Sequence, residues 1–105
     1  MIPCICIDDS NRPKEIPADK WVKEEEEYTI THVYIHPNQG GIQGVTLYEK
    51  PLDESCKPYE TFKLSRFAIH AKDLEAFIEL CKSCSELDEV DVLKLVEESE
   101  LQTVD

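Results

Sequence analysis

The chain has 105 residues and a formal net charge of −12, because 23 acidic side chains outnumber 11 basic ones. This length suits one domain, and 41% hydrophobic residues with four Tyr, three Phe and one Trp argue against a fully disordered chain. No apolar run approaches the roughly 20 residues that span a bilayer, and the acidic balance argues against direct binding of nucleic acid or of an anionic membrane.

The first half of the chain predicts three strands, at residues 2–7, 28–35 and from 42 or 43 to 49. The first is strand-like because small apolar residues alternate, and the second because seven of its eight positions are β-branched or aromatic. A long excursion over residues 10–27 separates them, with Trp21-Val22 as its apolar anchor and four consecutive glutamates after it. The turn at residues 36–41 then predicts a hairpin.

The second half of the chain predicts a last strand followed by helices. A proline-bounded loop at 50–58 precedes the strand at 59–64, and a short turn at 65–68 buries Phe67. Helical spacing of apolar residues indicates a helix over 71–83 and a second one that ends at Glu98, with Ser85 followed by Asp88 as its N-terminal cap. We expect one domain over 1–98, divided into a β part (1–68) and a helical part (69–98), with a frayed tail at 99–105.

This order of strands is that of an SH3-like antiparallel β-barrel, and four segments carry the likeness: Cys6-Ile7-Asp8, Trp21-Val22-Lys23 leading into Tyr28-Thr29-Ile30, Gly44 to Glu49, and Phe62 to Phe67. The chain resembles a group of small uncharacterised SH3-like barrel proteins of bacterial and phage genomes over residues 4–68. Glu26 stands where their pattern has a glycine. The resemblance implies an α+β fold, a small barrel followed by one or two C-terminal helices, and no established activity.

Five cysteines and no apparent export signal predict free thiols in a reducing, cytoplasmic compartment. Two readings stay open for the pairs Cys4/Cys6 and Cys81/Cys84. Both pairs lie in the core as small hydrophobes, or together they supply the four thiolates of a zinc site. The strand-like alternation around the first pair and the helical spacing of the second favour the core, so no cofactor is expected.

No histidine has the neighbours that a catalytic motif requires, which predicts that the protein is not an enzyme. His32 is expected to be a partly buried polar side chain. The aromatic residues Trp21, Tyr34, Tyr48 and Tyr59 are the predicted binding surface, with Trp21 exposed and Tyr28 in the core. Lys50, Lys57, Lys63 and Arg66 flank the last two strands, and Arg66 is expected to contact a carboxylate or loop carbonyls.

Three functions follow from these features. The first is a non-enzymatic module that binds another, unidentified protein. The second is an acidic inhibitor that mimics nucleic acid and binds a basic enzyme, because residues 71–105 carry eleven acidic and three basic side chains. The third is a small metal- or ligand-binding protein. Open edge strands also allow a homodimer.

Overall fold

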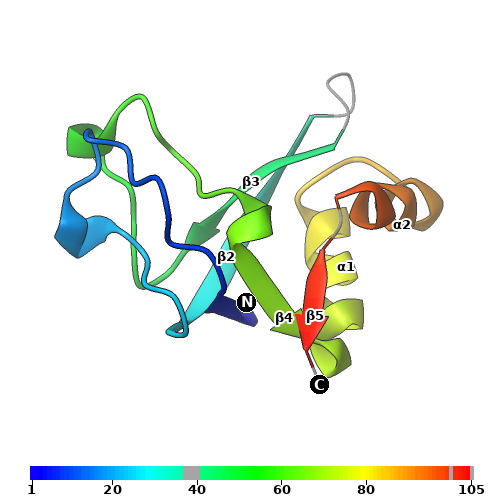
Figure 1. Cartoon of the computed structure of the whole chain (residues 1–105). Coiled ribbons are helices and arrows are strands. Elements are labelled where there is room, and N and C mark those ends of the chain that lie inside the picture. The colour runs from blue at the N-terminus through cyan, green and yellow to red at the C-terminus, as the bar shows by residue number, and fades with distance from the viewer. Residues whose placement is uncertain (37–40, 100, 105) are drawn as a thin grey trace.

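The computed structural model describes residues 1–36, 41–99 and 101–104, and has an α+β fold (Figure 1). Its strands are β1 (Ile2–Cys6), β2 (Glu27–His36), β3 (Gly41–Leu47), β4 (Phe67–His70) and β5 (Gln102–Val104), and its α-helices are α1 (Leu74–Ser83) and α2 (Glu89–Glu98). The predicted first strand, hairpin strands and two helices are therefore confirmed, whereas most of the predicted turn at 36–41 lies outside the described residues.

The strands form one sheet in the order β3-β2-β1-β4-β5, antiparallel except for the parallel pair β4/β5. β1 is central because it pairs on both sides, and Cys4 lies opposite Tyr28 of β2 and Ile69 of β4. Both edges of β1 are thus paired, and its alternate residues Ile2, Cys4 and Cys6 are buried in the core.

The sheet is open rather than a closed barrel, because it ends at β3 on one side and at β5 on the other. The prediction of a strand at 59–64 is wrong. Within these residues only Phe62 pairs, in an isolated bridge to Val45 on the outer edge of β3. A 3-10 turn at Leu64–Arg66 follows, and the residues predicted to form a turn, 65–68, instead lead into β4. Phe67 is buried, as predicted.

The two helices lie together on one side of the sheet, with α1 against β2 and α2 against β3 (Figure 1). The cap predicted at Ser85 followed by Asp88 is formed by Asp88, which accepts a hydrogen bond from the Asp91 backbone N–H at 2.9 Å. The prediction of a frayed tail at 99–105 is wrong in part, because β5 follows α2 and pairs with β4. Two parallel strands need such a crossover, and here the helices provide it.

On the other side of the sheet lie the N-terminal excursion and the loop after β3 (Figure 1). Each loop contributes buried side chains to the same apolar cluster as the sheet and helices: Ile16, Trp21 and Val22 from the excursion, and Cys56 from the later loop. The core therefore extends through the sheet into both loops, which fixes their position. Within the described residues, no helix is long and apolar enough to cross a membrane.

Candidate functional site

A hollow of about 260 Å³ lies between the N-terminal excursion and the chain that leads into β4, and we call it the loop hollow. Its lining comprises Asn11, Pro13, Ile16 and Trp21 from the excursion, and Tyr59, Thr61, Phe62, Lys63 and Arg66 from the later segment. Two of the four aromatic residues predicted to form a binding surface, Trp21 and Tyr59, therefore meet here. Ligand sites are concave and combine apolar walls with a few polar groups, so this hollow is the candidate site.

The Trp21 indole is a wall of the loop hollow rather than a protruding anchor. Only 8% of Trp21 is exposed, so the prediction of an exposed indole is wrong. Its Nε1 donates a hydrogen bond to the Asp9 carbonyl at 2.7 Å, and its ring centroid lies 5.7 Å from that of Phe62. The Arg66 guanidinium carbon lies 4.7 Å from the indole centroid, a cation–π contact. Phe62 and Arg66, which are distant in the sequence, cover the ring. The charged residues that neighbour Trp21 in the sequence give no indication of these contacts.

Arg66 links the start of the N-terminal excursion to the start of β4 through hydrogen bonds. Its Nη1 donates hydrogen bonds to the carbonyls of Ser10 at 2.7 Å and Asp8 at 3.1 Å, and lies 3.8 Å from the Asp8 carboxylate. The predicted contact with loop carbonyls is confirmed. The Ser10 hydroxyl and backbone N–H donate to the Asp8 carboxylate and hold the pKa of Asp8 below its usual range, and the charges of Arg66 and Lys63 act in the same direction.

Among the described residues, the lining of the loop hollow contains two cations and no carboxylate, although the whole chain carries −12. Arg66 is buried and already bonded, whereas Lys63 is exposed and forms no ion pair with any described residue. The other two predicted basic neighbours lie elsewhere: Lys50 donates to the Asp19 carbonyl, and Lys57 pairs with Glu54. Lys63 is thus the cation of this site that can receive an anionic group.

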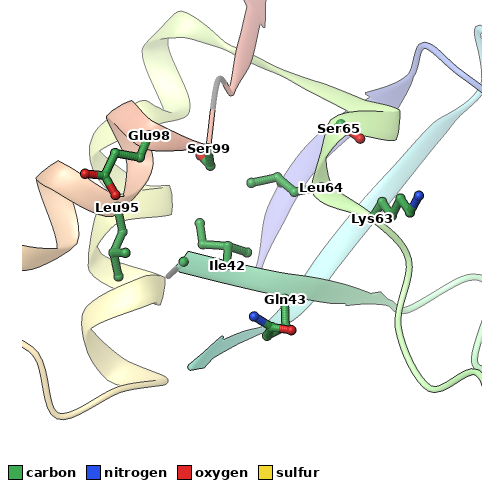
Figure 2. A pocket seen from close by; sticks show the side chains of 9 residues that line it. Ile42, Gln43, Lys63, Leu64, Ser65, Leu95, Glu98 and Ser99 are labelled. Carbon is green, nitrogen blue, oxygen red and sulfur yellow. The ribbon is translucent and has the colours of Figure 1, made fainter. Parts of the chain in front are cut away.

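A second hollow, of about 230 Å³, also borders Lys63 and lies between the start of β3, residues 63–65 and the C-terminal end of α2 (Figure 2). The side chains of Ile42, Leu64 and Leu95 form its apolar part. In Figure 2 the Lys63 side chain points away from these apolar groups. Lys63 lines both hollows, and its side chain is directed away from the apolar part of this second one.

The remaining aromatic residues of the predicted surface do not line the loop hollow. Tyr34 on β2 is 44% exposed and packs edge-on against His32, and Tyr48, which follows β3, is 71% exposed. Tyr28 is buried as predicted, and its hydroxyl accepts a hydrogen bond from the Lys23 backbone N–H. The sequence pointed to Trp21 and Tyr59 but missed Asn11 and Pro13, because turn-forming residues in a loop carry no signal of what faces them.

The predicted core position of the cysteine pairs holds for three of their four thiols. Cys4, Cys6 and Cys81 are buried, whereas Cys84 is partly exposed and its Sγ lies 3.4 Å from His32 Nδ1. His32 is half-buried, as predicted. Within the described residues no group of three or more His, Cys, Asp or Glu side chains could hold a metal ion, so the four-thiolate zinc alternative has no counterpart there.

Comparison with known proteins found no relative: no protein-family profile, curated protein or solved structure matches the chain.

Proposed function

We propose that this protein is a non-enzymatic interaction module that binds an extended peptide segment of a partner protein in the loop hollow. The observation that carries the proposal is the meeting of Trp21, Tyr59 and Lys63 in one hollow. Aromatic side chains are favoured anchors in interfaces because they bury a large area at low entropic cost. Tyr59 is 39% exposed, which leaves its ring free to be covered by an incoming chain.

The strand order supports a variant of the SH3-like fold for this module. The residues after β3 return at Phe62 to the outer edge of that strand, and a 3-10 turn then leads into β4 beside β1. This path brings the chain part of the way round a barrel. SH3-type domains bind extended peptides in aromatic-lined grooves, and the loop hollow occupies the position between the long first loop and that 3-10 turn.

The charges of the loop hollow define the chemistry of its occupant. An apolar side chain of the peptide would cover the exposed part of the Tyr59 ring in the hollow that Trp21 helps to line, and a neighbouring carboxylate would approach the Lys63 amine. Arg66 does not take this role because its guanidinium is buried against loop carbonyls. The partner segment therefore contains an apolar residue next to Asp, Glu or a C-terminal carboxylate, which differs from the basic target expected of an acidic protein.

A random-peptide display library selected against the wild-type protein tests this proposal. We expect a consensus that pairs an apolar residue with an acidic one. Affinity for the selected peptide should fall about tenfold in Tyr59→Ala and about fivefold in Lys63→Glu, as expected for an interface anchor and an exposed ion pair.

Matched controls come from two exposed residues outside the loop hollow. Tyr48→Ala removes the same ring, and Lys72→Glu makes the same charge reversal. Both should bind the selected peptide with unchanged affinity. Equal losses in the control variants, a consensus without a carboxylate, or a selection that yields no peptide would contradict the proposal.

A further inference from the structure

We propose that Cys84 is a nucleophilic thiol that forms a mixed disulfide with a small-molecule disulfide, with His32 as the acceptor of its proton. Cys84 follows the last residue of α1, and His32 lies in the middle of β2, 52 positions away in the sequence. The fold brings Cys84 Sγ to 3.4 Å from His32 Nδ1. A thiol beside an imidazole is the arrangement that activates cysteine nucleophiles.

Both partners are held in place by independent contacts. The His32 ring packs edge-on against Tyr34, with ring centroids 4.5 Å apart, which limits rotation of the imidazole. The Cys84 backbone N–H donates a hydrogen bond to the Leu80 carbonyl at 3.0 Å, as the cap of α1. The sulfur and the nitrogen therefore meet as a consequence of how α1 packs on β2.

The other four thiols provide an internal comparison, because each is at most 1% exposed. Burial raises the pKa of Cys4 and of Cys81 to about 12, and it also raises that of Cys6. Cys4, Cys6 and Cys81 therefore stay protonated at neutral pH, and all four thiols are closed to solvent. Cys84 differs in both respects that matter for reaction: it is partly exposed, and it has a base in contact.

The reaction balances without any further reactant. The Cys84 thiol gives its proton to His32 Nδ1, and the sulfur attacks one sulfur of the small-molecule disulfide, whose S–S bond breaks as the new S–S bond forms. The departing thiolate then takes the proton from His32. One protein thiol and one disulfide become one mixed disulfide and one small thiol. Cys81, one helical turn earlier, is fully buried, so the mixed disulfide is the expected product.

Oxidised glutathione at neutral pH is the probe, with intact-mass spectrometry to follow the adduct and peptide mapping to locate it. We expect one adduct on the folded wild-type protein, at Cys84, and none in Cys84→Ser. In His32→Asn, which keeps a polar atom near the thiol but no base, the rate should fall about tenfold or more. Adducts on the buried cysteines of the folded protein, or an unchanged rate in a folded His32→Asn, would overturn the proposal.

The wild-type protein alone gives a second measurement that does not depend on the variant folding. The rate at Cys84 in the folded protein is compared with the rate at the same residue in urea, where all five cysteines are accessible. We expect Cys84 to react faster in the folded state, because only that state places His32 beside it, while the other four thiols react only in urea. A slower reaction of Cys84 in the folded state would refute the role of His32.

Discussion

The turn that precedes β2 holds a glutamate in a backbone conformation that suits glycine, and replacing Glu25 with glycine should stabilise the protein. The Glu26 backbone N–H donates to the Lys23 carbonyl at 3.1 Å, which closes the turn, and Glu25 at its third position has φ 75°. A residue with a Cβ pays about 1–2 kcal/mol for this left-handed conformation, and glycine loses about 0.5–1 kcal/mol more backbone entropy on folding. The expected net gain is about 0.5–1 kcal/mol.

Hydrogen bonds to β1 prevent this turn from relaxing. The Glu25 backbone N–H donates to the Cys6 carbonyl at 2.8 Å, and the Cys6 N–H donates to the Glu26 carbonyl at 2.9 Å. The resemblance to SH3-like proteins placed the missing glycine at Glu26, and the backbone places the left-handed residue one position earlier. Urea unfolding measures the effect, and we expect Glu25→Gly to raise the midpoint with an unchanged slope.

Glu24→Gly is the matched control for this prediction. It removes the same charge from the run of four glutamates, but the backbone of Glu24 lies outside the left-handed region, so glycine there brings only its entropic cost. We expect Glu24→Gly to lose about 0.5–1 kcal/mol while Glu25→Gly gains a similar amount. If both variants shift the midpoint in the same direction by the same amount, charge relief explains the result and the backbone argument is refuted.

Three further predictions concern packing, pH and the helices. Gly44→Ala should destabilise the protein by about 1–3 kcal/mol in urea unfolding, because a Cβ there would lie 2.9 Å from the Phe62 carbonyl oxygen. The hydrogen bond from Lys20 holds the pKa of Asp53 far below its usual range, so its stabilisation is present above about pH 4 and lost as the pH falls further. In urea unfolding, wild type should therefore be more stable than Asp53→Asn at neutral pH, and the difference between them should shrink as the pH falls below about 4. Truncation after Cys84 removes α2 with its two buried valines, and calorimetry should show loss of the cooperative transition.

The sequence predicted the elements whose pattern is local. The β-branched and aromatic run of β2 and the helical spacing of α1 and α2 each identify an element without knowledge of its neighbours. β4 was missed because it is only four residues long and buried at three of them, with no alternation to mark it. β5 is exposed at every position, so its strand conformation comes from pairing with β4 and has no local signal.

The candidate site was predictable only in part, because its geometry depends on contacts between residues that are distant in the sequence. Tyr59 and Trp21 were identified as binding aromatics from residue type, but the burial of Trp21 depends on Phe62 and Arg66, more than 40 residues later in the chain. The contact between Cys84 and His32 likewise arises from the packing of α1 on β2. Helical spacing placed Cys84 one turn beyond Cys81, but spacing cannot state which strand residue a helix end will meet.

Salt dependence separates the proposed peptide module from an acidic mimic of nucleic acid. A mimic relies on many charges at long range, and residues 71–105 carry a balance of −8 for such a role. Binding in the loop hollow relies on apolar contact and on one exposed pair at Lys63, worth about 0.2–1 kcal/mol. Full screening of that pair changes affinity by at most roughly fivefold. We therefore expect the selected peptide to remain bound at high salt in isothermal titration; a loss of many orders of magnitude would instead place the binding surface on the acidic helical part.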